Sequence, residues 1–275
     1  MQPSSEPFLK AYKSETKQSG IFPYRYLLST PPSYKDDTTK HWPLLLYLHG
    51  SGESHSNNIE LAKAHGIPRL VQAYENLKNG KPAPEKTQYR SEPLPEDFEE
   101  LPPVNLGCAK IVAEQFITLT PQVEPDPKDN SVDWEVKSLS ALLDEIEKKY
   151  RVDKERIYVT GNSMGGFGAF SLAQEQPERF AAIIPICGGG DPESAIKLKN
   201  LPIWVLHGYK DDIVPFHNSE EMVDALKKIE GNVKFTTFTD AWHDCWTETY
   251  NMKEIYEWLL LQKKPLRTST TEIYS

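Results

Sequence analysis

A serine between small residues is the strongest chemical signal in this 275-residue sequence. Residues 161–165 read GNSMG, a G-x-S-x-G pattern centred on Ser163, between the strand-like run RIYVT and the helix-like run GFGAFSLAQ. This context is typical of a nucleophile on a sharp strand-to-helix turn, where large side chains two positions away would clash. The turn also places the amide of Met164 at a helix N-terminus, which favours a bound oxyanion. We expect Ser163 to act as the nucleophile and Met164 to donate to the oxyanion.

The partners of such a serine are a histidine that accepts its proton and a carboxylate that fixes the histidine tautomer. After the run PIWVL, the segment HGYKDDIVP offers Asp211 and Asp212, although either residue could instead cap the turn. His243, in AWHDCW, follows both, and Ser-Asp-His is the chain order used with a G-x-S-x-G turn in an α/β sheet. We therefore expect His243 to be the base, and we interpret His217 as a surface or capping residue.

A second backbone donor for the oxyanion is expected in the segment LHGSGE, which directly follows the run PLLLY. The amide of Ser51 is our first choice for this donor, and the amide of Gly52 is the alternative. A simple turn at the end of a strand would look the same in sequence. We expect Gly50, Gly52 and Asn162, which flank the donors and the nucleophile, to border the substrate.

The aromatic and thiol residues near these motifs have structural interpretations as well as chemical ones. Trp242 and Trp246 flank His243 and could pack in the core, but Trp246 could also form a wall of the substrate pocket. Cys245 follows His243 without the sharp turn of a nucleophile, and Cys187 reads as a small buried residue. The odd number of cysteines and the lack of C-x-x-C spacing predict free thiols and no metal site.

The elements that must position these residues alternate between apolar strand-like runs and helix-periodic runs. Continuous apolar runs such as LLLYL and AAIIPI indicate strands that are covered on both faces. Predicted strands cover residues 24–29, 43–48, 116–120, 156–160, 181–186, 203–206 and 233–238. Predicted helices cover residues 134–150, with Asp133 as N-cap, 164–174, 219–229 and 253–261. The alternation predicts an α/β fold with a mostly parallel central sheet and helices on both faces.

Residues 81–105 interrupt this alternation because they are rich in proline and acidic residues. We interpret them as a solvated surface insertion, with a lid beside the active site as the alternative, since long loops in compact domains are often functional. No repeat or second domain boundary is evident, so we expect residues 1–275 to form a single domain.

Composition and charge exclude several classes of partner. Hydrophobic residues make up 38% and charged residues 26%, which is ordinary for a globular protein, and the net charge is -9. A nucleic-acid-binding protein would need a basic face, so no nucleic-acid partner is expected. The first residues, MQPSSEPFLKAYKSE, contain no apolar run long enough for a signal peptide, and no stretch of the sequence is long and apolar enough to span a membrane. These features predict a cytoplasmic protein with no membrane span.

Taken together, the motifs resemble serine esterases of the α/β-hydrolase superfamily, in the branch of phospholipase/carboxylesterases, dienelactone-hydrolase-like proteins and polyhydroxybutyrate-depolymerase-like esterases. The resemblance rests on YLHGSGE, RIYVTGNSMGGFGAFSLA, PERFAAIIPICGGGD, PIWVLHGYKDDIVP and WHDCWTETY, which lie between residues 43 and 261. It implies an α/β-hydrolase fold with Ser163 as nucleophile, Asp211 rather than Asp212 as the acid, and His243 as the base. Residues 81–105 look longer than the family norm.

The resemblance implies hydrolysis of a small-molecule carboxylic ester through an acyl-enzyme, a reaction that requires no metal or organic cofactor. A serine peptidase or a thioesterase with the same three residues is an alternative hypothesis. A non-catalytic binding protein on the same fold is a further hypothesis, against which the intact Ser163, Asp211 and His243 argue.

Overall fold

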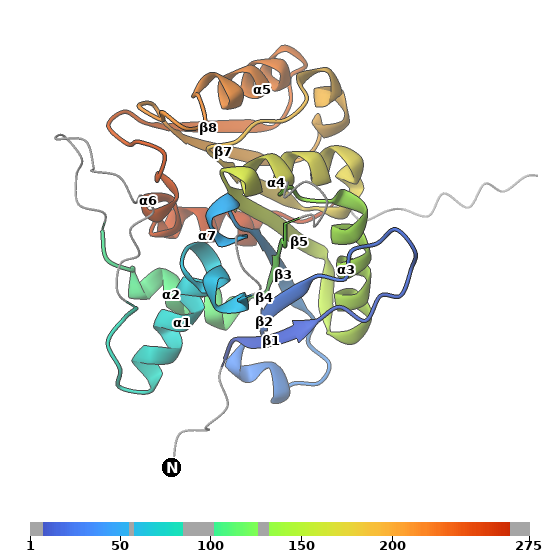
Figure 1. The fold of residues 1–275 in the computed structure, drawn as a ribbon, viewed down its shortest axis with the longest axis vertical. Helices are drawn as coiled ribbons and strands as arrows, with labels where there is room; N and C mark the ends of the chain where they lie inside the picture. Colours follow the sequence, from blue (N-terminus) through green and yellow to red (C-terminus); the bar gives the residue numbers. More distant parts are fainter. Residues whose placement is uncertain (1–7, 55–57, 85–101, 126–131, 265–275) are drawn as a thin grey trace, which may run out of the picture.

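The protein is built around one twisted sheet (Figure 1). The structure is a computed structural model that describes residues 8–54, 58–84, 102–125 and 132–264. Over these residues, eight strands follow the order β1-β2-β4-β3-β5-β6-β7-β8. They are β1 (Lys10–Lys13), β2 (Arg25–Ser29), β3 (Trp42–Leu48), β4 (Ile117–Gln122), β5 (Val152–Asn162), β6 (Ala182–Ile186), β7 (Ile203–Gly208) and β8 (Val233–Phe238). Strands β3 to β8 pair in parallel, whereas β1 and β2 join through antiparallel pairing.

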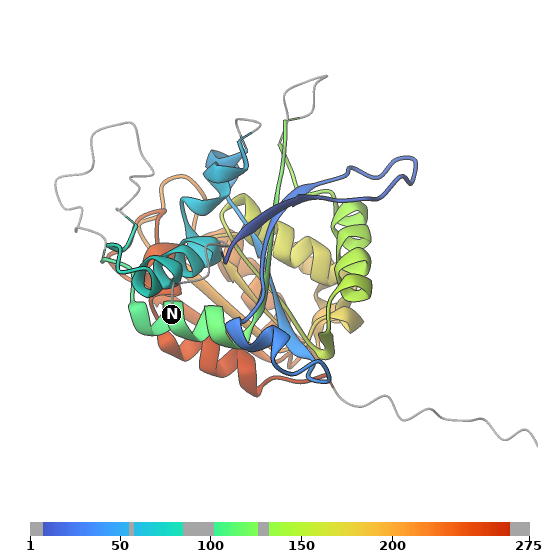
Figure 2. The same ribbon diagram turned by 90° about the horizontal axis from the view of Figure 1, so that it is seen from below.

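Helices cover both faces of the sheet, which Figure 2 shows between two helical layers. One layer contains α1 (Gly66–Lys78), α2 (Leu106–Gln115), α6 (Trp246–Tyr250) and α7 (Lys253–Leu261). The other contains α3 (Val136–Lys149), α4 (Met164–Glu175) and α5 (His217–Lys228). Short 3-10 turns lie in the connections: η1 (Pro32–Lys35), η2 (Ser51–Glu53), η3 (Ile59–Lys63), η4 (Pro177–Arg179) and η5 (Pro192–Leu198). The predicted fold class, a mostly parallel sheet with helices on both faces, is confirmed.

The core has two halves because the side chains of each central strand alternate between the faces of the sheet. Along β3, Leu44, Leu46 and Leu48 pack on the side of α3 and α4, while Leu45 and Tyr47 pack on the side of α1 and α2. All seven residues of β3 are buried. Burial on both faces explains why these strands read as unbroken apolar runs.

Several elements differ from the sequence-based expectation. The prediction did not include β1, α1, α2 or α6 among the elements that the structure describes. Helix α1 begins with Gly-Ile-Pro, residues that weaken a helical pattern, although proline is tolerated in a first helical turn. Strand β1 is mostly exposed and has no apolar alternation. The predicted N-cap of α3, Asp133, was wrong: the Glu135 side chain accepts from the amides of Lys137 and Ser138.

The proline-rich segment predicted at residues 81–105 is described only at its two ends. Residues 85–101 lie outside the described part of the chain, so both interpretations of this segment remain predictions. At its end, the Asn105 side chain accepts from the amides of Gly107 and Cys108 and so caps α2. The assignment of residues 1–275 to one domain also remains a prediction. None of the helices in the described ranges is long and apolar enough to cross a membrane.

Candidate active site

The predicted chemical residues gather at one edge of the sheet. Ser163 follows β5, Asp211 follows β7 and His243 follows β8. Because these strands are parallel, their carboxyl ends meet at the same edge, where open α/β sheets bind ligands. Three segments that are far apart in the sequence therefore lie side by side.

Ser163 lies on a strained turn between β5 and α4. Its backbone has φ 55° and ψ −122°, a conformation that costs a non-glycine residue about 1–3 kcal/mol. The surrounding structure holds the turn, since the Ser163 amide donates to the carbonyl of Ile186 at 3.0 Å. Glycine is required on either side: a Cβ on Gly161 would lie 2.4 Å from the Gly165 oxygen, and a Cβ on Gly165 would lie 1.9 Å from the Leu48 oxygen.

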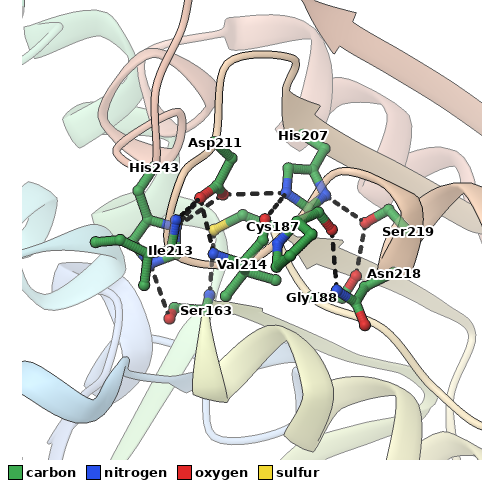
Figure 3. Close-up of polar contacts among 11 residues, drawn as sticks. Ser163, Cys187, Gly188, His207, Asp211, Ile213, Val214, Asn218, Ser219 and His243 are labelled. Atoms are coloured by element: carbon green, nitrogen blue, oxygen red, sulfur yellow. Dashed lines mark hydrogen bonds and ion pairs between the residues drawn. The ribbon is translucent and has the colours of Figure 1, made fainter.

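The imidazole of His243 lies between the serine hydroxyl and a carboxylate (Figure 3). Its Nε2 is 3.0 Å from Oγ of Ser163, and its Nδ1 is 2.9 Å and 2.8 Å from the two carboxylate oxygens of Asp211. All three residues are buried, with exposed fractions of 5% for Ser163, 8% for Asp211 and 2% for His243. Such burial strengthens the electrostatic interactions among them.

Asp211 is held as a carboxylate by several donors. Its Oδ1 accepts from the amides of Ile213 at 3.0 Å and Val214 at 2.9 Å, and its Oδ2 is 3.0 Å from Nε2 of His207. Burial by itself raises the pKa of Asp211, but hydrogen bonds from His207 and His243 outweigh burial and leave this pKa below its ordinary value. An ionised Asp211 accepts only, so Nδ1 of His243 carries the proton and Nε2 presents its lone pair to Ser163.

The residues that competed with these in sequence lie elsewhere. Asp212 is exposed, and Nδ1 of His243 contacts Asp211. His217 is the first residue of α5 and is also exposed. The structure therefore brings together the serine, acid and histidine that the family resemblance favoured.

The two amides expected to face an oxyanion begin neighbouring helical turns. Ser51 is the first residue of η2, which follows β3, and Met164 is the first residue of α4, which follows β5. Strands β3 and β5 pair with Leu48 opposite Gly161, so the two turns leave the sheet at the same level. The first amides of a helix have no intrahelical acceptor and are available to an anion.

A buried histidine that sequence analysis did not single out fixes the turn before Ser51. Nε2 of His49 accepts from the amide of Val123 at 3.1 Å, and its Nδ1 donates to the carbonyl of Gly50 at 2.6 Å. The indole of Trp134 donates to the His49 carbonyl at 3.2 Å. Burial lowers the pKa of His49 to about 4, so this ring is neutral at pH 7. The position of His49 directly before Gly50 and Ser51 was the sequence signal that could have indicated this supporting role.

Of the four predicted substrate-contacting residues, Gly52 is exposed and the other three are buried. Asn162 is fully buried, and its Oδ1 accepts from the Tyr47 hydroxyl at 2.8 Å. Trp246 is also fully buried, and its ring packs edge-on against His243 with centroids 5.1 Å apart. Gly50 lies against Asn162 and Glu53, where a Cβ would approach to 3.2 Å and 3.6 Å. The substrate contacts predicted for Gly50, Gly52, Asn162 and Trp246 remain predictions.

Two buried acids near the site were not singled out as candidates from sequence. Burial raises the pKa of Glu53 to about 8 and that of Asp244 to about 6. Asp244 accepts from the amide and hydroxyl of Thr247 at the start of α6, which anchors the segment that carries His243. Because its pKa is about 8, Glu53 is mostly protonated at pH 7, and its buried side chain adds little negative charge near the site.

One group of side chains has metal-ligand chemistry. Cys187, Asp211 and His243 are buried and offer ligand atoms within 4.8 Å of one another. Burial raises the pKa of Cys187 well above its ordinary value, which keeps it a thiol. Its Sγ accepts from the Ser163 amide at 3.3 Å, and the other two residues are hydrogen-bonded to each other. These atoms are thus engaged within the serine site.

Comparisons with known proteins identify the family of this chain. Residues 118–262 match the family described as phospholipase/carboxylesterase. A bifunctional acetylxylan esterase/xylanase from Neocallimastix patriciarum is 31% identical over 83 residues, which cover 30% of this chain and 12% of that protein. A probable feruloyl esterase C from Aspergillus niger is 30% identical over 92 residues, which cover 33% of each protein. The chain thus matches a third or less of the length of these curated relatives.

A solved structure extends the similarity to nearly the whole chain. The crystal structure of a thermostable esterase is 27% identical and superposes with a TM-score of 0.69, covering 93% of this chain and 63% of that one. The family match spans more than half of the chain and includes β4 to β8 with their helices. The chain belongs to the phospholipase/carboxylesterase family and has the α/β-hydrolase fold.

Proposed function

We propose that this protein hydrolyses carboxylic esters, with Ser163 as nucleophile, His243 as general base and acid, and Asp211 as the carboxylate that orients His243. The observation that carries the proposal is the 3.0 Å contact between Nε2 of His243 and Oγ of Ser163. This distance lies within hydrogen-bond reach, which a general base requires. Family membership supports the same activity.

Acylation begins when Nε2 of His243 takes the hydroxyl proton of Ser163. The freed electron pair of Oγ forms a bond to the ester carbonyl carbon, and the carbonyl electrons move onto its oxygen. Nδ1 of His243 stays bonded to Asp211, whose negative charge stabilises the imidazolium. The carbon–oxygen bond to the alcohol then breaks, and the alkoxide takes the proton from Nε2.

The tetrahedral oxyanion is stabilised by backbone donors in this proposal. The amides of Met164 and Ser51 begin α4 and η2, so both N–H groups are free of intrahelical carbonyls. The loss of one such donor typically costs about 2.7–4 kcal/mol of transition-state stabilisation. His49 and Trp134 hold the turn that carries Ser51, and they act through position rather than through contact with the substrate.

Deacylation repeats the sequence with water in place of the serine hydroxyl. Nε2 of His243 removes a proton from water, the hydroxide oxygen bonds to the acyl carbon, and Oγ of Ser163 leaves with the proton from His243. One water is consumed, and one carboxylic acid and one alcohol are released. The reaction needs no group beyond the protein side chains and backbone amides.

Removal of the serine hydroxyl is the direct test of this function. We expect Ser163→Ala to reduce hydrolysis of p-nitrophenyl acetate to near background while the circular dichroism spectrum stays unchanged. Ser171→Ala is the matched control, since Ser171 is an exposed serine on the same helix, α4, and should keep full activity. Full activity in Ser163→Ala would overturn the proposal.

The ester preference is tested with matched substrates at one enzyme concentration. The names of the relatives motivate acetyl and feruloyl esters as the first substrates. We expect p-nitrophenyl acetate or methyl ferulate to be hydrolysed faster than an acyl thioester or a peptide anilide. A higher kcat/KM for the thioester or the anilide would reassign the protein to a thioesterase or a peptidase with the same three residues.

A further inference from the structure

Asp211 contacts two histidines, and the second one has no role in the mechanism above. His207 is the penultimate residue of β7 and is fully buried. Figure 3 shows Asp211 between the rings of His207 and His243. We call these three side chains the two-histidine cluster. A buried ring with polar atoms on both sides allows its protons to be assigned from the hydrogen bonds.

The first ring nitrogen of His207 faces only acceptors. Its Nε2 is 3.0 Å from Oδ2 of Asp211 and 3.0 Å from the carbonyl oxygen of Val214. A carbonyl has no proton to give, and Asp211 is held in its ionised form. Nε2 of His207 must therefore carry a proton.

The second ring nitrogen faces a hydroxyl whose proton is already used. Nδ1 of His207 is 2.7 Å from Oγ of Ser219, and this Oγ is 2.6 Å from the carbonyl oxygen of Gly188. Two oxygens at 2.6 Å need a hydrogen between them, and only Ser219 can supply it. The hydroxyl therefore donates to Gly188 and accepts from His207, so Nδ1 also carries a proton.

We propose that His207 is a buried imidazolium that pairs with Asp211 and acts as a positioning residue for His243. Both ring protons follow from these contacts, because Nε2 faces only acceptors and Nδ1 faces a hydroxyl that donates its proton to Gly188. The pair of Asp211 and His207 is then neutral, which lowers the cost of burying the carboxylate. The kinetic consequence rests on the proposed function, whereas the charge of His207 does not.

Several ionisable groups lie around the two-histidine cluster. Phe216 and Ser219, at the start of α5, contribute no charge to the His207 ring. Cys187, after β6, interacts electrostatically with Asp211 and Cys245, and Asp244, after β8, interacts with His243 and with Arg69 of α1. Cys187 stays a thiol because burial raises its pKa, and burial also raises the pKa of Asp244 to about 6. A charged His207 would place its positive charge in direct contact with Asp211, because its Nε2 is 3.0 Å from Oδ2 of that carboxylate.

A positive charge on the far side of Asp211 opposes protonation of His243. His243 must be neutral to act as a base, so this charge extends the activity toward lower pH. Removal of the charge should move the acid limb of the kcat/KM profile to higher pH. A residue that only packed in the core would lower kcat/KM equally at all pH values and leave the limb in place.

Nuclear magnetic resonance of the 15N-labelled protein reads the charge of His207 without any substrate. We expect both ring nitrogens of one histidine to have imidazolium shifts at pH 8, and these signals to be missing from the His207→Gln spectrum. In Ser219→Ala, loss of the acceptor for Nδ1 should change these signals toward a neutral ring. A His207 ring with one unprotonated nitrogen at pH 8 would overturn the proposal, even if the protein is an active esterase.

The pH profile completes the test. We expect the acid limb of the kcat/KM profile of His207→Gln to lie about one pH unit higher than that of the wild type. At pH values on this limb, kcat/KM of the variant should then be about tenfold lower than that of the wild type. Ser219→Ala should move the limb in the same direction by less and covers the case in which His207→Gln does not fold. His217→Gln, which removes an exposed histidine of α5, is the control and should leave the limb unchanged. An unmoved limb in both test variants would contradict the positioning role.

Discussion

The tripeptide Leu-His-Gly occurs at the end of both β3 and β7, and its two histidines have opposite surroundings. Both rings are fully buried. His49 meets one donor and one acceptor, because Val123 gives it an N–H and Gly50 takes one. Nε2 of His207 faces two acceptors, and its Nδ1 faces the Ser219 hydroxyl, which already donates its proton to Gly188.

This difference indicates that the hydrogen-bond partners of a buried histidine set its protonation state, whereas the neighbouring residues in the sequence do not. The neutral ring of His49 fixes the turn that carries the proposed oxyanion donor Ser51. The charged ring proposed for His207 fixes the carboxylate that orients His243. The same tripeptide thus supports two different parts of one site from two strands of the same sheet (Figure 1).

The largest expected effect comes from the acceptor that both His207 and His243 share. We expect Asp211→Asn to lower kcat/KM for p-nitrophenyl acetate by about 10⁴-fold, because the amide no longer fixes the His243 tautomer. Asp212→Asn is the matched control at the adjacent exposed position and should change kcat/KM by less than about threefold. Equal losses in the two variants would remove Asp211 from its assigned role.

A smaller loss of activity is expected when His49, the other histidine of the comparison, is changed. His49→Gln should lower kcat/KM by about 10²-fold at every pH, because the turn of Ser51 loses the ring that ties it to Val123. The acid limb should stay in place, unlike in His207→Gln, since His49 carries no charge at these pH values. His41→Gln, at an exposed histidine, serves as the control. A shifted limb in His49→Gln would remove the contrast between the two histidines.

The smallest expected effect is on the pH dependence of stability. It arises because burial lowers the pKa of His49 to about 4. This value lies below the unfolded value of 6.5, so the unfolded state binds more protons and stability is lost as pH falls from 6.5 toward 4. Between pH 7 and pH 5 this loss is about 2 kcal/mol. His49→Gln has no histidine at this position and so lacks this pH-dependent loss. Urea unfolding measures the difference in the free energy of unfolding between the wild type and the variant, and we expect this difference to be about 2 kcal/mol smaller at pH 5 than at pH 7. His65 has a similar shift but is present in both proteins, so its contribution cancels. A difference that does not change with pH would contradict the neutral ring.

Much of the fold was predictable from local pattern. Continuous apolar runs marked β3, β6 and β7 because these strands are covered on both faces. The turn at Ser163 was predictable because its glycines meet backbone atoms, which leaves the sequence little choice. Helices α1 and α2 were missed because their small and proline residues hide the helical period, and tertiary packing supplies the stability instead.

The candidate site was predictable where chain order carries information and hidden where long-range contacts decide. Ser163 and His243 follow from motif and order, and Asp211 from the family resemblance. One partner of each buried histidine lies farther along the chain, since Val123 is 74 residues from His49 and Ser219 is 12 residues from His207. Only the folded chain shows which groups give and which accept a proton.

The central claim is that His243 and Asp211 make Ser163 a nucleophile, and covalent labelling tests it most directly. The protein is treated with a fluorophosphonate and digested, and the modified peptide is identified by mass spectrometry. We predict a single phosphonate adduct on Ser163 that forms much more slowly in Asp211→Asn and is absent from Ser163→Ala. An unlabelled wild-type protein, or an adduct on another residue that persists in Ser163→Ala, would contradict the account.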